Sequence, residues 1–371
     1  MSPPIAPRIA YVINSVEGGG AASPVPAVTG ILRDCGAAVR IFALTRRDGK
    51  SLAAMEAAGL EPLVRDGGET DHIAAMRWMV REIRTWGATH VWTSLSRATI
   101  LGLLAGPHLG LPVIAWQHAA FLKPWNRRLM RLLQSRATLW VADSHCVAKL
   151  TAERLKVPAR RLETWPIFAA DPAKPVAQPW QSGQPLKIGS LGRLHPVKGY
   201  DVLIDALGLL KAQGFTPPAP LEISIAGDGA EREQLAARMA ERGVSIALPG
   251  FTNDPAAYLA SQHLYCQPSR SEGFCIGVHE ALTAGLPVIA SNVGEPALTI
   301  RSGETGWTCA PSNPAMLADV LHLALSDPNA LAGMGRSART EMLDRFSQAR
   351  FRQRGTSIWS RIALKRDPTR S

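Results

Sequence analysis

Short apolar runs that favour β-strands alternate with helical segments along most of this 371-residue chain. The sequence predicts strands at residues 8–14, 38–43, 90–93, 112–116 and 138–142, with helices at 25–35, 72–85, 98–104 and 146–155 between them. Such alternation is typical of a parallel sheet covered by helices on both faces. With 46% hydrophobic and 19% charged residues, the chain can fill cores of this kind and is not predominantly disordered.

The pattern breaks at residues 171–185, which contain four prolines and little periodicity, and we interpret them as a linker. A second alternating unit follows, with strands expected at 187–191, 221–226, 244–248, 263–266 and 286–290 and a helical ending. The expected organisation is therefore a first domain at 1–175, a second at 176–345 and a final helix at 346–371. Two domains suit the length.

The charge is uneven. The net charge of +11 divides into +9 for residues 1–175, −5 for 176–335 and +7 for 336–371. Nucleic acid, an anionic membrane surface and an anionic substrate could each explain two basic ends.

Five cysteines form no C-x-x-C pair, and residues 1–7 lack an apolar signal-peptide core, so we expect a reducing cytosol. The nearly uncharged run 98–116 is broken by Gly106-Pro107 and by Gly110-Leu111-Pro112, which favours a buried helix, a turn and a strand over a membrane span. No zinc-type spacing occurs, and no metal is expected.

Two glutamates flank a glycine-bearing loop. Glu272 follows a predicted strand, and Glu280 lies just inside the next helix. Outward backbone amides between Gly273 and Gly277 would suit a diphosphate, and the carboxylates could accept hydrogen bonds from vicinal hydroxyls. The alternative is an ordinary helix start with a dipole-favoured glutamate.

Arg193 and Lys198 occupy another loop that follows a strand. A planar guanidinium and a compact ammonium could together neutralise a diphosphate. A solvated basic loop is the alternative. His195, between them, is left unassigned.

Two features of the first half are candidates for a site. Gly19 and Gly20 follow the first strand and permit close approach of a phosphate or sugar, or simply a tight turn. A dinucleotide fingerprint fails because Ser23 occupies its third glycine position. His118 directly follows a strand and could be catalytic or structural.

Residues 121–136 combine Lys123, four arginines, Phe121 and Trp125 with leucines at helical spacing. A basic amphipathic helix with aromatics suits an anionic lipid surface. A core-facing helix with a solvated arginine face is the alternative.

Together, these motifs resemble the retaining glycosyltransferases of family 4 (glycosyl transferases group 1), which have the α/β GT-B fold of two facing Rossmann-like domains. The motifs are Gly192-Arg193, Lys198-Gly199, Gly227-Asp228-Gly229, Gly250-Phe251, Glu272 with Glu280, and Gly303 to Trp307. The resemblance implies a final helix that crosses back to the first domain.

The resemblance also implies roles for individual residues. Arg193 and Lys198 would bind the donor diphosphate, Glu280 the ribose hydroxyls and Glu272 the transferred sugar. Phe251 would lie near the base, and His118 near the reacting sugar. The remaining implied donor contacts are Gly19, Gly20, Gly273, Phe274, Cys275, Ile276 and Gly277.

The implied function is transfer of a sugar, with retention of configuration, from a nucleotide sugar to a lipid-linked, lipopolysaccharide or exopolysaccharide acceptor. The donor is a substrate, with a UDP-sugar placed before a GDP-sugar, and no cofactor is expected. The protein would act in the cytoplasm, peripherally on the inner face of the membrane, without nucleic acid. The alternatives are a nucleotide-sugar epimerase or hydrolase on the same fold, and a non-catalytic membrane- or nucleic-acid-binding protein.

Two departures from the family pattern concern the acceptor side. The family often ends its first domain with Asn-Gly-Val-Asp, where this chain has Ile167-Phe-Ala-Ala-Asp171 after Pro166. The glycine loop is followed by Ala21, Ala22 and Ser23 instead of a charged residue.

Overall fold

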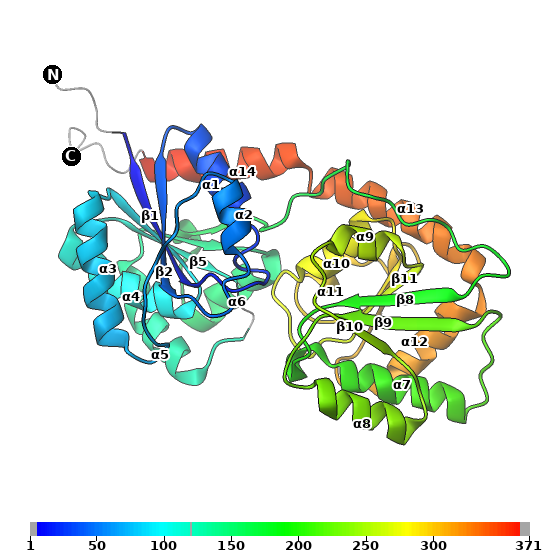
Figure 1. Cartoon of the computed structure of the whole chain (residues 1–371). Coiled ribbons are helices and arrows are strands. Elements are labelled where there is room, and N and C mark those ends of the chain that lie inside the picture. The colour runs from blue at the N-terminus through cyan, green and yellow to red at the C-terminus, as the bar shows by residue number, and fades with distance from the viewer. Residues whose placement is uncertain (1–5, 119–120, 364–371) are drawn as a thin grey trace. The chain divides into compact units, whose positions relative to one another are not determined.

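The computed structural model describes residues 6–118 and 121–363. The chain divides into two compact units (Figure 1). Unit 1 comprises Met1–Ile167 and Ala349–Ser371, and unit 2 comprises Phe168–Gln348. Each is an α/β unit built on one parallel sheet, as the alternating pattern predicts.

Unit 1 contains a seven-stranded sheet of order β3-β2-β1-β4-β5-β6-β7. The strands are β1 (Arg8–Ser15), β2 (Ala38–Thr45), β3 (Leu63–Val64), β4 (His90–Ser94), β5 (Val113–Gln117), β6 (Leu139–Ala142) and β7 (Leu162–Thr164). The helices are α1 (Val25–Asp34), α2 (Leu52–Ala57), α3 (His72–Trp86), α4 (Ser96–Leu109), α5 (Pro124–Leu133), α6 (His145–Leu155) and α14 (Gln348–Ala363). The central strands are almost entirely buried, as strands covered on both faces must be.

Unit 2 contains a six-stranded sheet of order β10-β9-β8-β11-β12-β13. The strands are β8 (Leu186–Leu191), β9 (Leu221–Ala226), β10 (Ala247–Gly250), β11 (Leu264–Gln267), β12 (Val288–Ser291) and β13 (Gly306–Cys309). The helices are α7 (Tyr200–Ala212), α8 (Arg232–Arg242), α9 (Pro255–Ala260), α10 (Ile276–Thr283), α11 (Pro296–Thr299), α12 (Pro314–Ser326) and α13 (Pro328–Arg345). Both sheets switch strand order at the centre, where ligands bind in folds of this type.

Edge elements differ most from the sequence prediction. The short outer strands β3, β7 and β13 are absent from it, because a run of two to four residues carries almost no periodic signal. The strand expected at 244–248 is wrong in its bounds, since β10 begins at Ala247. Helix α4 continues through Gly106-Pro107 and ends at Leu109, so the expected break at Gly106-Pro107 is wrong. The expected order of a buried helix, a turn and a strand is confirmed, with the turn at Gly110-Leu111-Pro112. Pro107 lies in the last turn, so it removes one backbone hydrogen bond just before the helix ends at the left-handed Gly110.

The boundary between the units precedes the expected one. Residues 168–175 belong to unit 2 instead of the first domain. The rings of Phe168 and Phe274 stack at 5.9 Å, and Arg339 donates a hydrogen bond to the Pro172 carbonyl. Residues 171–185 are therefore not a free linker, because their backbone is hydrogen-bonded within unit 2, as at Pro172 and where the Ala177 amide donates to the Ala284 carbonyl.

Helix α14 packs in unit 1, which confirms the returning C-terminal helix, although it begins at Gln348 instead of residue 346. Trp165 donates its indole N–H to the Phe351 carbonyl at 3.1 Å. A Cβ at Gly355 would lie 2.3 Å from the Trp165 ring, so only glycine permits this approach. Trp165 also stacks on Trp116 of β5, with ring centroids 5.1 Å apart, so α14 supports the centre of the sheet.

Candidate functional site

The carboxyl edge of the unit 2 sheet brings together two loops that are distant in sequence. Strands β8 and β11 are neighbours, with Leu264 opposite Ile188. The loop after β8 carries Arg193 and Lys198, and the loop after β11 carries Glu272. Parallel strands end at the same edge, so the topology places these loops side by side.

Lys198 and Glu272 form an ion pair, with Nζ 2.8 Å from Oε1. The side chains are only 22% and 10% exposed. Burial alone would lower the pKa of Lys198, but the Glu272 carboxylate outweighs it and the pKa is raised. Lys198 therefore stays cationic at physiological pH. Gly199 allows the loop after β8 to lie close to the loop after β11. Its φ is +66°, and a Cβ at this position would lie 2.1 Å from the Pro268 carbonyl oxygen.

Glu272 ends a hydrogen-bond chain that starts inside the sheet. The Tyr265 hydroxyl donates to Gln267 Oε1 at 2.9 Å, and Gln267 Nε2 donates to Ser269 Oγ at 2.9 Å. Ser269 Oγ then donates to Glu272 Oε1 at 2.6 Å. The sequence prediction missed Ser269 and Gln267. Gln267 ends β11 and Ser269 follows it by two residues, a spacing that indicates extended backbone but not a chain of hydrogen bonds.

The glycine-bearing loop leads into α10, which begins at Ile276. Cys275 adopts a left-handed conformation, with φ +61°, as the residue before the helix. The first amides of a helix have no intrahelical acceptor and carry partial positive charge, so the stretch from Phe274 to Gly277 can bind an anion. Burial raises the pKa of Cys275, which favours its neutral thiol.

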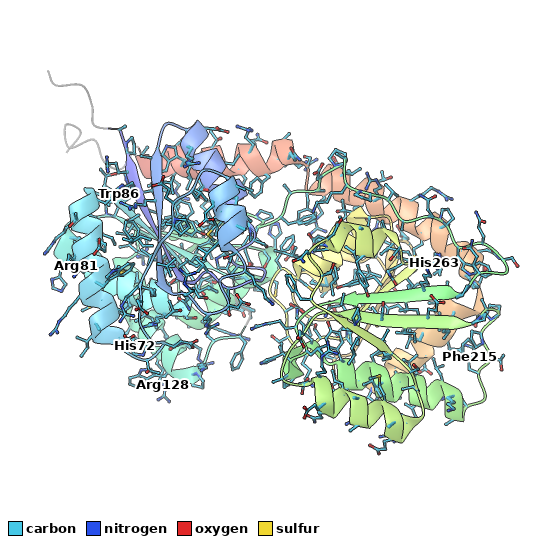
Figure 2. All side chains as sticks on the ribbon, in the orientation of Figure 1. His72, Arg81, Trp86, Arg128, Phe215 and His263 are labelled. Atoms are coloured by element: carbon cyan, nitrogen blue, oxygen red, sulfur yellow. The ribbon has the colours of Figure 1, made fainter. Side chains whose placement is uncertain are left out.

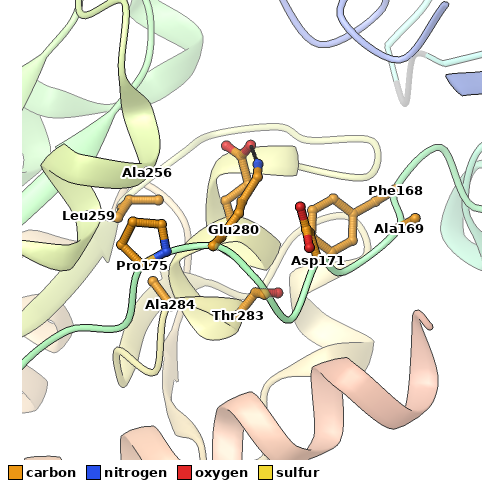
Figure 3. A pocket seen from close by; sticks show the side chains of 10 residues that line it. Phe168, Ala169, Asp171, Pro175, Ala256, Leu259, Glu280, Thr283 and Ala284 are labelled. Atoms are coloured by element: carbon orange, nitrogen blue, oxygen red, sulfur yellow. Dashed lines mark ion pairs between the residues drawn. The ribbon is translucent and has the colours of Figure 1, made fainter. Parts of the chain in front are cut away.

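Glu280 projects from α10 beside a small pocket (Figure 3). The pocket is lined by Asp171, Lys174, Ala256, Leu259, Thr283 and neighbouring residues of unit 2. Lys174 Nζ lies 3.5 Å from Glu280 Oε1. Burial raises the pKa of Glu280, and Lys174 partly opposes this. The sequence prediction missed Lys174, because it precedes Glu280 by over a hundred residues and lies in the presumed linker.

Two further predicted donor contacts are more accessible. Arg193 is exposed, and Phe251, directly after β10, is 54% exposed. Unit 2 thus assembles two cations, two carboxylates, a helix N-terminus and an aromatic ring at one sheet edge. Such a set can bind a diphosphate flanked by hydroxyl groups.

The other predicted site residues lie in unit 1. Gly19 and Gly20 are exposed in the turn after β1, where the Gly19 carbonyl accepts from the Ala22 and Ser23 amides. His118 follows β5 and is buried against Trp116, with ring centroids 5.3 Å apart.

Among residues 6–118 and 121–363, no group of three or more metal-ligating side chains converges. Within the same ranges, no helix is both long and apolar enough to cross a membrane.

Comparison with known proteins agrees with this architecture. Two similar parallel-sheet units, with a helix returning from the second to the first, define the GT-B fold. The family described as Glycosyltransferase Family 4 matches residues 19–168, and the family described as Glycosyl transferases group 1 matches residues 176–341. The chain belongs to the family 4 glycosyltransferases with the GT-B fold.

Individual relatives are distant. The D-inositol 3-phosphate glycosyltransferase of Jonesia denitrificans is 33% identical over 155 residues, 40% of this chain and 37% of that protein. Glycogen synthase of Mycobacterium tuberculosis is 30% identical over 204 residues, 54% of this chain and 45% of that enzyme. These matches thus span less than half of either relative. The crystal structure of Anabaena HepE with UDP and glucose covers 95% of this chain and 99% of that one, with 19% identity and a TM-score of 0.81.

Proposed function

We propose that this glycosyltransferase moves a hexose from a UDP-sugar to a lipid-linked, lipopolysaccharide or exopolysaccharide acceptor with retention of configuration. The observation that carries the proposal is the buried Lys198–Glu272 pair beside the N-terminus of α10. The cation suits the donor diphosphate, and the carboxylate suits hydroxyls of the transferred sugar.

The proposed chemistry needs no protein nucleophile. The bond between the sugar C1 and the diphosphate oxygen breaks, and the acceptor oxygen bonds to C1 on the same face. The acceptor proton passes to a donor phosphate oxygen. Lys198, Arg193 and the α10 amides stabilise the negative charge that develops on the departing diphosphate.

The donor is the first question to test. Anabaena HepE was crystallised with UDP and glucose, which makes UDP-glucose the first candidate, with GDP-sugars as the alternative. Purified protein is incubated with a panel of UDP-, GDP- and ADP-sugars, and the free nucleoside diphosphate is measured. Release from one base class, lost in Lys198→Met and Glu280→Gln, supports the proposal. Binding of no nucleotide sugar contradicts it and favours the non-catalytic alternative. Release from wild type that no saccharide acceptor accelerates favours the hydrolase alternative.

An anionic membrane surface is the proposed location of the acceptor. Helix α5 buries Met130 and Leu133, but it leaves Trp125 and Leu132 70% and 76% exposed. Phe121, which lies three residues before the start of α5, is 66% exposed. Two large apolar side chains of the helix are thus exposed, which a core-facing helix with a solvated arginine face does not explain.

Cations flank these exposed apolar side chains. Lys123, Arg127, Arg128, Arg131 and Arg136 are all exposed, and Figure 2 shows Arg128 at the surface of unit 1. Exposed apolar groups with surrounding cations of one sign suit the interface of an anionic bilayer.

A further inference from the structure

Three consecutive strands of the unit 1 sheet each deliver one polar side chain to the same place. Ser94 is the last residue of β4, His118 directly follows β5, and Asp143 directly follows β6. These strands are neighbours, with Ser94 opposite Trp116 and Gln117 opposite Ala142. The convergence depends on the register of three strands, and the sequence prediction considered His118 alone.

The three side chains form a buried row. Ser94 Oγ lies 2.8 Å from His118 Nε2, and His118 Nδ1 lies 3.4 Å from Asp143 Oδ2. The His118 and Asp143 side chains are 6% and 4% exposed, and Ser94 is fully buried. The Trp116 ring stacks on the imidazole and limits its rotation. Because the His118 ring is buried, its hydrogen bonding depends on Ser94 and Asp143 and not on solvent.

The arrangement favours one of the two ring nitrogens as the site of the proton. A carboxylate oxygen 3.4 Å from Nδ1 repels a nitrogen lone pair and attracts an N–H, so Asp143 favours the proton on Nδ1. In the neutral ring Nε2 is then an acceptor, and the Ser94 hydroxyl can donate to it.

We propose that Asp143 and Ser94 are positioning residues that hold His118 with Nδ1 protonated and Nε2 as a hydrogen-bond acceptor for a hydroxyl. Ser94 supplies that hydroxyl in the free protein. A hydroxyl of the bound saccharide takes its place during the reaction. This inference rests on the proposed function for its saccharide partner, but the protonation pattern of His118 does not.

Asparagine at position 143 provides the decisive test. Its amide N–H can donate to Nδ1, which favours the opposite tautomer with the proton on Nε2, as in catalytic triads where this exchange disables the histidine. The ring ¹⁵N shifts of His118 are measured by NMR and assigned from their loss in His118→Gln. We expect the Nδ1–H pattern in wild type and Ser94→Ala, and its reversal in Asp143→Asn. An Nε2–H pattern in wild type, or an unchanged pattern in Asp143→Asn, overturns the proposal.

Kinetics give a second, independent measurement. We expect Asp143→Asn to lower kcat by about tenfold or more while the donor KM stays within about threefold. Asp34→Asn, an exposed carboxylate of unit 1 paired with Arg352, is the matched control and should leave kcat unchanged. Full kcat in Asp143→Asn overturns the positioning role. If wild type turns over no nucleotide sugar, the proposed function fails, and the ¹⁵N pattern still decides the role of Asp143.

Discussion

Lys198 Nζ lies 2.8 Å from Glu272 Oε1, with both side chains largely buried at the carboxyl edge of the unit 2 sheet. The two residues come from loops after different strands, β8 and β11. Lys198, proposed to bind the diphosphate, and Glu272, proposed to bind the sugar, therefore act as one electrostatic unit. Glu272 keeps Lys198 charged, and the ion pair holds both side chains in place before a donor arrives.

Breaking this pair should impair both stability and turnover. Glu272→Gln leaves a buried, unpaired ammonium, and we expect a loss of about 2 kcal/mol in the free energy of unfolding. Lys198→Met should lower kcat/KM for the donor about 100-fold, because a cation that stabilises the leaving group is lost. Urea unfolding and donor turnover measure the two effects.

The double variant Lys198→Met/Glu272→Gln distinguishes coupling from two independent losses. Its loss in the free energy of unfolding should be at least about 1 kcal/mol smaller than the sum of the losses in the two single variants. Asp205→Asn, which removes a more exposed charge paired with Arg238 and Arg242, is the control. Strict additivity would contradict the description of the pair as one unit.

Glu280 should make unit 2 less stable as pH rises. Burial raises its folded-state pKa, so the folded protein binds this proton more tightly than the unfolded chain does. The buried charged carboxylate of Glu280 lowers the stability of the fold. This loss is absent below the ordinary glutamate pKa and is complete above the raised pKa of Glu280. Glu280→Gln should therefore raise Tm at pH 8 but not at low pH, while weakening UDP binding. Thermal unfolding and calorimetric titration across this pH range measure both.

Lys174 provides a second test of the Glu280 pKa. Lys174 opposes the rise in the Glu280 pKa, so Lys174→Met should raise this pKa further. Because the proposed ribose contact needs the Glu280 carboxylate, UDP affinity should fall when this group is protonated. In Lys174→Met that fall should therefore begin at a higher pH than in wild type. Lys211→Met removes an exposed cation that bonds the Gly243 carbonyl and should change neither profile. Identical pH profiles for wild type and Lys174→Met would show that Lys174 does not act on Glu280.

Gly355→Ala should weaken the packing of α14 in unit 1. The new methyl would lie 2.3 Å from the Trp165 ring and must displace it or the helix. We expect a loss of about 1–3 kcal/mol, the usual range for overpacking a core. Chemical denaturation and tryptophan fluorescence report it. Gly333→Ala, in the interior of α13, whose Cβ would meet only one flexible arginine end at 3.8 Å, should cause no loss of stability.

Helix α5 should bind anionic lipid. Trp125→Ala/Leu132→Ala should reduce sedimentation with phosphatidylglycerol vesicles because exposed apolar area is lost. Arg127→Glu/Arg128→Glu should reduce it further and remove its salt dependence between about 0.1 M and 1 M salt.

Two controls apply to the membrane prediction. Vesicles of phosphatidylcholine alone should bind weakly, and Lys187→Glu/Lys211→Glu, the same charge change in unit 2, should bind like wild type. Equal binding by all variants, or no salt-dependent binding by wild type, would exclude α5 as a membrane surface.

Local sequence patterns predicted the fold class, and they also predicted that Glu272 lies in a loop between a strand and a helix. Apolar strands alternating with helices require covered parallel sheets, and Glu272, the glycine-bearing loop and Glu280 lie within nine consecutive residues. Their arrangement depends on one strand end and one helix start, which short-range sequence encodes. The edge strands and the boundary at Ile167 were missed because packing, and not periodicity, decides them.

The sequence by itself determined that strands end where Arg193, Lys198, His118 and Glu272 lie, because period and turn chemistry are local properties. Only the tertiary structure decided which of these groups touch. The order β8-β11 pairs Lys198 with Glu272, and the order β4-β5-β6 places Ser94 and Asp143 on either side of His118. Strand order is set by how the helices cover the two sheet faces. That burial sums over the whole unit, so no single segment of the sequence contains it.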